Sequence, residues 1–145
     1  MKKKSVEFKL KAEKQDFSIV KITSSLDSAD YARKFYFDDI NIYESVFVIL
    51  LSQAQNTIGY AKISQGGVSS CLVDKKIVAK YAIESLSSAV ILVHNHPSGC
   101  LKPSKYDDQL TKEIKECLQV FDIRLIDHVI ITEDSFYSYN DEGRL

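Results

Sequence analysis

Residues 94–107 read HNHPSGCLKPSKYD, and three of their side chains, His94, His96 and Asp107, can bind a metal ion. The run before them, residues 89–94 (AVILVH), is apolar and rich in β-branched residues, which predicts a buried strand ending at His94. Residues two apart in an extended backbone point to the same side, so both histidines can face one ion. Pro97 favours this arrangement, because it disfavours the helical region for His96.

A helix is expected to begin directly after this stretch. Ser104 and Asp107 have the Ser-x-x-Asp spacing of a helix start, and apolar residues recur at helical spacing as far as Phe121. Asp107 then lies in the first turn, where the helix dipole favours its ionised, metal-binding form. Two imidazoles and one carboxylate supply three of the four ligands that zinc prefers, and a place left for water distinguishes a catalytic site from a structural one. We therefore expect one Zn²⁺ per chain, which lowers the pKa of water toward ~7 and polarises a carbonyl.

Such a site needs a base for the proton of water, and Glu44 is the candidate. It precedes residues 45–52 (SVFVILLS), the longest apolar strand-like run in the chain, which should be central in the sheet. A solvated residue at the edge of a strand is the alternative interpretation of Glu44. For Ser104, a helix N-cap is a complete structural explanation, and both roles can apply at once.

These residues resemble a known motif. The pattern His94-x-His96, seven residues, Ser104, two residues and Asp107, with Glu44 upstream, looks like the JAMM motif of JAB/MPN-plus metalloproteases. The similarity covers roughly residues 20–140 and is strongest to the RadC branch. It is carried by residues 63–73 (ISQGGVSSCLV), 91–99 (ILVHNHPSG), 103–107 (PSKYD) and 125–131 (LIDHVII).

The resemblance implies roles for these residues. His94, His96 and Asp107 would be the zinc ligands, Glu44 the general base, and Ser104 the support of the tetrahedral oxyanion. It also implies the cytidine-deaminase-like three-layer fold of JAB/MPN domains. The family cleaves peptide or isopeptide bonds, often beside a ubiquitin-like tail, although no substrate is established for the RadC branch. Full-length RadC proteins usually carry an N-terminal helix-hairpin-helix region, for which this chain has no room.

Composition limits the class of protein. With 145 residues, 45% hydrophobic and 27% charged, the chain is expected to form a single domain, with its core at about residues 20–140 and residues 1–19 as a strand or hairpin extension. A formal net charge of −1 argues against a generally basic nucleic-acid-binding domain. No apolar run reaches the ~20 residues of a membrane span, and no signal peptide is recognisable. Three widely spaced cysteines, Cys71, Cys100 and Cys117, indicate a reduced, cytoplasmic protein.

The pattern of the chain predicts an α/β fold, a mixed β-sheet sandwiched by helices. Ser24 or Ser25 should cap the first helix and Asp74 the second. The expected helices are residues 26–37, 75–86 and 104–121. The expected strands are residues 5–11 and 17–23 as an N-terminal hairpin, 45–52 and 57–64 as an antiparallel pair, 89–94, and 124–132 and 135–139 as a final hairpin.

Several residues near the motif are expected to have structural roles or to be solvated. His128 is expected to be a structural histidine rather than a ligand, and Asp127 a local hydrogen-bond partner. Cys100 is expected to point outward rather than bind zinc, and Asn95 to brace the loop. Lys102 and Lys105 could attract an anionic substrate tail but are more often simply solvated. The letters HNH at residues 94–96 give no support to an HNH nuclease, whose residues are spread over a ββα unit.

Three functions remain open. The first is a zinc metallohydrolase of JAMM type that acts on a protein or peptide. The second is a DNA-associated factor or nuclease, because the RadC name is associated with DNA repair. The third is a non-catalytic interaction module. The oligomeric state is not predicted by the sequence.

Overall fold

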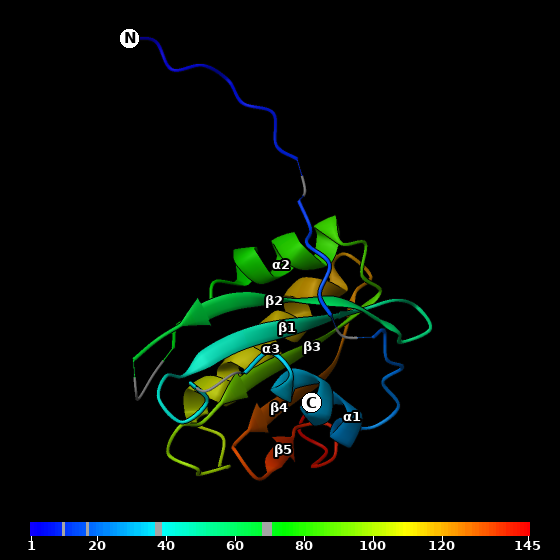
Figure 1. Ribbon diagram of the computed structural model, residues 1–145, viewed down its shortest axis with the longest axis vertical. Helices are drawn as coiled ribbons and strands as arrows, with labels where there is room; N and C mark the ends of the chain where they lie inside the picture. The colour runs from blue at the N-terminus through cyan, green and yellow to red at the C-terminus, as the bar shows by residue number, and fades with distance from the viewer. Residues whose placement is uncertain (10, 17, 37–38, 68–70) are drawn as a thin grey trace.

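A mixed β-sheet forms the centre of the computed structural model, which describes residues 1–9, 11–16, 18–36, 39–67 and 71–145 (Figure 1). Its strands are β1 (Ser45–Leu51), β2 (Thr57–Gln65), β3 (Ala89–Asn95), β4 (Arg124–Ile131) and β5 (Phe136–Ser138). The strand order is β2-β1-β3-β4-β5. β3 and β4 are parallel, whereas β1–β2, β1–β3 and β4–β5 are antiparallel. The mixed sheet, the pairing of β1 with β2 and the final hairpin are confirmed.

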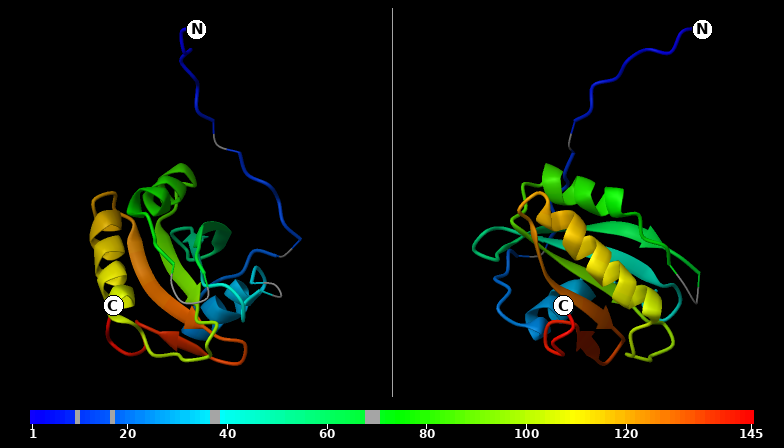
Figure 2. Two further views of the ribbon diagram at one scale, coloured as in Figure 1. Left: turned by 90° about the vertical axis from the view of Figure 1, so that its left-hand side faces the viewer. Right: turned by 180° about the vertical axis from the view of Figure 1, so that it is seen from behind.

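In the part of the chain that the structure describes, helices cover both faces of this sheet (Figure 2). They are α1 (Ser25–Arg33), α2 (Lys75–Glu84) and α3 (Lys105–Gln119). Helices α2 and α3 lie over one face, and α1 lies over the other. The predicted three-layer arrangement is therefore confirmed. Within the described residues, none of these helices has the length and apolar character needed to span a membrane.

Strands β1 and β3 are buried along their entire length, because both of their faces are covered. Alternate residues of each strand join two separate cores. Val48 and Leu92 pack with α2 and α3, whereas Ile49 and Ile91 pack with α1 and its aromatic neighbours. This explains why these two strands read as continuous apolar runs in the sequence.

Side chains at the predicted caps begin the helices. Ser24 and Ser104 each form a capping box with the aspartate three residues later, and Asp74 accepts a hydrogen bond from the backbone of Lys76. Helix α1 ends at Arg33, earlier than the predicted residue 37, which lies outside the described residues. The backbone N–H groups of Lys34 and Phe35 instead form tight turns onto Tyr31 and Ala32.

The predicted N-terminal hairpin is wrong for the part of residues 1–20 that the structure describes. Leu10 and Phe17, which belonged to that prediction, lie outside the described residues. The described residues before Lys21 form no strand, and in Figure 1 residues 1–9 extend away from the sheet. Val6 and Phe8 are mostly exposed, at 71% and 89%. An alternating pattern specifies a strand only where one face can be buried, and an isolated hairpin is marginal in water.

Strand register brings the ends of four elements together. Strand β3, rather than β1, occupies the middle of the sheet. His94 pairs with Val46 of β1 on one side and with Ile130 of β4 on the other. The residues just before β1 therefore lie beside the end of β3, where the chain continues toward α3.

Burial of α3 against the sheet yields a prediction for stability. Ile114 is fully buried in the core beneath α3, whereas Ile83 in α2 is 40% exposed. We expect Ile114→Ala to lower the free energy of unfolding by about 2–5 kcal/mol, because it leaves a cavity. Ile83→Ala removes the same atoms from a helix surface and should have a much smaller effect. Urea denaturation of both variants tests this, and equal losses would contradict the assigned packing of α3.

Candidate metal centre

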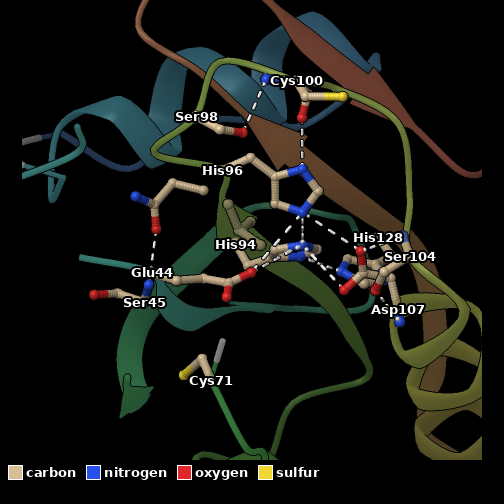
Figure 3. A network of polar contacts seen from close by, with 12 residues as sticks. Glu44, Ser45, Cys71, His94, His96, Ser98, Cys100, Ser104, Asp107 and His128 are labelled. Carbon is tan, nitrogen blue, oxygen red and sulfur yellow. Dashed lines mark hydrogen bonds and ion pairs between the residues drawn. The ribbon is translucent and has the colours of Figure 1, made fainter. Parts of the chain in front are cut away.

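Four side chains meet at the carboxyl end of β3. One ligand atom from each of Glu44, His94, His96 and Asp107 lies within 4.8 Å of all the others, so the cluster could hold a metal ion. Figure 3 shows Glu44 on one side of the two imidazoles, with Asp107 and Ser104 on the other. The four residues come from sequence positions up to 63 apart, and the fold brings them together.

Asp107 is oriented by the start of α3. Its backbone N–H donates to the Ser104 hydroxyl at 3.0 Å, and its Oδ2 accepts from the backbone N–H of Ser104 at 2.8 Å. This capping box fixes the carboxylate against the helix end. Oδ1 then lies 3.3 Å from Nε2 of His94, and Oδ2 lies 3.4 Å from Nε2 of His96. The same two residues therefore stabilise the helix and position a carboxylate in the cluster.

His96 is oriented by the turn that follows it. Gly99 has a φ of 82°, a conformation that glycine adopts readily, and its N–H donates to the carbonyl of His96 at 3.0 Å. The chain thereby returns the carbonyl of Cys100 to 2.6 Å from Nδ1 of His96. Because a carbonyl oxygen only accepts, Nδ1 carries the proton. The lone pair of His96 is thus on Nε2, toward the cluster.

His94 is buried at the end of β3. Its Nδ1 lies 2.7 Å from Nε2 of His128, and its Nε2 lies 2.8 Å from Nε2 of His96. His128 is fully buried, and its Nδ1 lies 2.6 Å from the Thr111 hydroxyl. His128 is therefore satisfied at both ring nitrogens and does not join the cluster of possible ligands.

Glu44 is held by its backbone rather than by its side chain. Its N–H donates to the carbonyl of Gly67 and its carbonyl accepts from Gly66, which extends the β1–β2 ladder beyond the strand ends. Asn95 accepts from the N–H of Ser45 at 2.8 Å and donates to the carbonyls of Ile40 and Tyr43. The backbone of Glu44 is thus held on both sides. Asn95 braces the loop before β1 rather than its own loop, for which that role was predicted.

The spacing of the four groups fits a three-ligand zinc site. Two ligands each about 2.0–2.1 Å from a zinc ion, at the tetrahedral angle, are about 3.3–3.4 Å apart. The distances from Asp107 to the two imidazoles, 3.3 and 3.4 Å, match this value. The two Nε2 atoms, at 2.8 Å, would have to separate by about 0.5 Å. Oε1 of Glu44 lies farther away, 3.9 and 3.8 Å from the two Nε2 atoms, beyond the spacing expected between two ligands of a tetrahedral zinc ion.

Burial and the neighbouring charges shift the pKa values in the cluster. Burial raises the pKa of Asp107, but its close contacts with His94 and His96 outweigh this effect, so this pKa lies far below its usual range. Burial raises the pKa of Glu44, and the two imidazoles offset only part of that rise. Burial lowers the pKa of His96, yet contacts with Asp107 and the Cys100 carbonyl give a net rise. Complete burial holds the pKa of His128 well below its usual value. Asp107 therefore stays ionised at neutral pH, and Glu44 is the carboxyl group whose pKa is shifted toward neutral pH.

An open cleft of about 640 Å³ leads to the cluster. The side chains of Glu44 and His96 are each 13% exposed, whereas His94 is only 2% exposed. The residues lining the cleft are Glu44, Cys71, Leu72, His96, Pro97, Ser98, Cys100, Lys102, Ser104, Tyr106 and Asp107. A hollow of about 740 Å³ lies elsewhere, beside residues 11–15 and 18–19 and the outer edge of β2, and none of the four cluster residues lines it. The cleft is therefore the opening of the cluster to solvent.

The structure also places Ser104, Cys100 and Asp127, the other residues considered in the sequence. Ser104 lines the cleft, and within the described residues its hydroxyl accepts one hydrogen bond and donates none. Cys100 is exposed, as expected, and contributes its carbonyl rather than its thiol. Asp127 accepts hydrogen bonds from Ser138 and from two backbone N–H groups, the local role predicted for it.

Two contributions were missed by sequence reasoning. Thr111 lies one helical turn after Asp107, and its hydroxyl joins the carbonyl of Asp107 to His128. The i, i+4 spacing of Asp107 and Thr111 was visible in the sequence, but the contact to His128 requires the packing of α3 on β4. The carbonyl of Cys100 has no sequence signal, because every residue carries a backbone carbonyl.

Comparisons with known proteins agree with this geometry. A family model described as "RadC-like JAB domain" matches residues 22–144. A UPF0758 protein from Flavobacterium johnsoniae is 42% identical over 101 residues, which cover 70% of this chain and 44% of that protein. Another from Porphyromonas gingivalis is 41% identical over 103 residues, 70% of this chain and 45% of that protein. A third, from Staphylococcus carnosus, is 39% identical over 125 residues, 86% of this chain and 54% of that protein. The chain spans about half the length of these relatives.

Removal of one carboxylate tests metal binding. We expect the wild type to carry about one zinc ion per chain and Asp107→Asn far less, because an amide is a weaker zinc ligand than a carboxylate. Asp27→Asn is the matched control, since Asp27 occupies the same capping-box position at the start of α1. Mass spectrometry of metal content, on protein purified without a chelator or a histidine tag, measures this. Equal zinc in both variants would place the ion elsewhere.

Proposed function

The chain belongs to the RadC-like JAB domain family, and from this premise we propose that it is a zinc-dependent hydrolase of JAMM type that cleaves a peptide or isopeptide bond. The observation that carries the proposal is the meeting of two imidazoles and two carboxylates within 4.8 Å at the floor of an open cleft. His94, His96 and Asp107 would hold the ion, and Glu44 would remain available as a base. When bound, zinc supplies a water of lowered pKa and polarises the carbonyl under attack.

Glu44 is the proposed general base. Its carboxylate faces the two imidazoles from the side opposite Asp107, and its pKa is raised by burial. A base whose pKa approaches the working pH transfers protons more effectively in both directions. Glu44 would take the proton of the attacking water and deliver it to the leaving amine. Its fixed backbone, tied to Gly66 and Gly67, keeps the carboxylate in place during both transfers.

Ser104 is the proposed support for the oxyanion. Its oxygen already accepts from the backbone of Asp107, so its proton can point into the cleft, toward the carbonyl oxygen of a substrate. A hydrogen bond that strengthens as negative charge develops lowers the barrier selectively. The cap and the oxyanion role use different parts of the same hydroxyl and are compatible.

The substrate that we propose is a protein or peptide, which an open cleft admits more easily than a closed pocket would. All three cysteines are free, which supports our proposal of a reducing compartment such as the cytoplasm. A catalytically silent interaction module would have no need of the complete set of Glu44, His94, His96 and Asp107. A DNA-associated role would be favoured by duplex binding that weakens steeply with salt.

Replacement of the base tests catalysis separately from metal binding. We expect Glu44→Gln to keep its zinc but to lose about 10²–10⁴-fold in kcat, because the amide cannot accept the proton of water. The assay uses a library of internally quenched fluorogenic peptides and a branched peptide with an isopeptide bond. A Glu44→Gln variant that loses its zinc would make Glu44 a ligand instead. A zinc-loaded wild type that cleaves none of these amides would contradict the hydrolase proposal.

A pair of cap variants separates the two roles of Ser104. Ser24 and Ser104 begin α1 and α3 with the same capping box, so Ser24→Ala and Ser104→Ala should each lower the free energy of unfolding by about 0.5–2 kcal/mol. Only Ser104→Ala should also lower kcat, by about 10²–10³-fold, if its hydroxyl supports the oxyanion. Thermal denaturation and the peptide assay measure the two effects. Unchanged kcat in Ser104→Ala would reduce Ser104 to a helix cap.

A further inference from the structure

A continuous chain of hydrogen bonds runs behind the cluster, on the side away from the cleft. It starts at the backbone carbonyl of Asp107, which accepts from the Thr111 hydroxyl at 2.7 Å. The Thr111 oxygen lies 2.6 Å from Nδ1 of His128, and Nε2 of His128 lies 2.7 Å from Nδ1 of His94. Nε2 of His94 in turn lies 3.3 Å from the side chain of Asp107. The hydrogen bonds from the Asp107 carbonyl to His94 thus link α3, β4 and β3.

The positions of the protons in this chain follow from its first member. The carbonyl of Asp107 can only accept, so the single proton of the Thr111 hydroxyl points to it. The Thr111 oxygen must then accept from His128, whose Nδ1 therefore carries the proton. The ring of His128 is 0% exposed, and its described hydrogen-bond partners are neutral side chains or another imidazole, so it holds a single ring proton. Its Nε2 is consequently an acceptor.

We propose that Thr111 and His128 are positioning residues that hold His94 in its metal-binding tautomer. With Nε2 of His128 as acceptor, Nδ1 of His94 must donate, and Nε2 of His94 keeps its lone pair toward Glu44, His96 and Asp107. His96 reaches the same tautomer by a separate route, through the carbonyl of Cys100. Two independent acceptors would thus turn both Nε2 lone pairs toward a metal ion held between the two rings. The inference rests on the proposed metal site and adds the residues that prepare it.

The surroundings of His128 keep this ring in one orientation. Tyr139 stacks on it, with ring centroids 4.8 Å apart and planes 4° from parallel. The hydroxyl of Tyr139 donates to Asp108 at 2.7 Å, and Arg144 donates to the same carboxylate oxygen at 2.7 Å. The C-terminal segment is therefore anchored to α3 over the back of His128. A ring held in this way cannot turn to offer the wrong nitrogen to His94 without breaking both hydrogen bonds.

The decisive variant is Thr111→Val, which keeps the shape of the side chain and removes only the hydroxyl. The acceptor of the His128 proton is then lost, and His128 is free to place its proton on Nε2, which turns His94 into the wrong tautomer. We expect zinc affinity to fall by about 10–100-fold, the usual effect of losing a partner behind a metal-binding histidine. His128→Phe, which keeps a ring against Tyr139, should have an effect of the same size. Affinity is measured by competition with a chromophoric chelator.

Two control variants separate positioning from loss of stability. Thr111→Ser restores the hydroxyl and should restore wild-type affinity. Thr57→Val removes a hydroxyl that is equally buried, at 3%, and hydrogen-bonded to the backbone of Val20 in another part of the sheet. It should lower the melting temperature without changing zinc affinity. If Thr111→Val and Thr57→Val both bind zinc as tightly as the wild type, Thr111 has only a structural role and the proposal is overturned.

The tautomers themselves can be read by NMR. The chain contains three histidines, all of them in this network, so selective ¹⁵N labelling of histidine reports on the site alone. In the zinc-loaded wild type we expect the proton on Nδ1 in all three rings. A proton on Nε2 of His128 would overturn the proposal even if zinc is bound. A wild type that takes up no zinc would instead overturn the proposed function, so the two failures are distinguishable.

Discussion

The buried ring of His94 needs a partner at each nitrogen, and that requirement ties together the parts of the molecule that form the cluster. On one side His128, from β4, fills the need at Nδ1. On the other side Nε2 faces Asp107 from α3, His96 from the loop after β3, and Glu44 from the start of β1. An imidazole that is 2% exposed would otherwise lose its hydration without compensation. The ends of these elements are therefore fixed relative to one another by one side chain.

The start of α3 serves two purposes with one motif. In α1, Oδ2 of Asp27 accepts hydrogen bonds from the backbone N–H of Ser24 and from the backbone N–H and hydroxyl of Thr23. These bonds cap the helix. In α3 the equivalent Asp107 keeps the same bond to Ser104 but also faces two imidazoles. The difference lies in the surroundings of the helix end. α3 begins beside the carboxyl end of β3, whereas α1 begins at the surface, so the same cap gains a chemical role only in α3.

Sequence reasoning succeeded where the signal was local. The caps at Ser24, Asp74 and Ser104 and the apolar runs of β1 and β3 were all visible as patterns within a few residues. The predictions failed where the structure depends on packing against distant parts of the chain. Residues 5–9 alternate like a strand, yet Val6 and Phe8 stay exposed. The end of α1 was also predicted too late, although Phe35 and Tyr36 beyond it are buried. The role of Thr111 could not be read, because a threonine inside a helix carries no mark of its distant partner.

Spacing along the chain was enough to predict a mixed sheet sandwiched by helices and the possible ligands His94, His96 and Asp107, because it limits which side chains can share a face or begin a helix. The roles expected for Glu44 and Ser104 came from the resemblance to the JAMM motif. That Glu44 reaches the imidazoles follows from folding, since it depends on the register that pairs Val46 with His94. The tertiary structure also decided the tautomers of His94 and His96. Those follow from acceptors on a neighbouring strand and on a returning loop, which become partners only when the chain has folded.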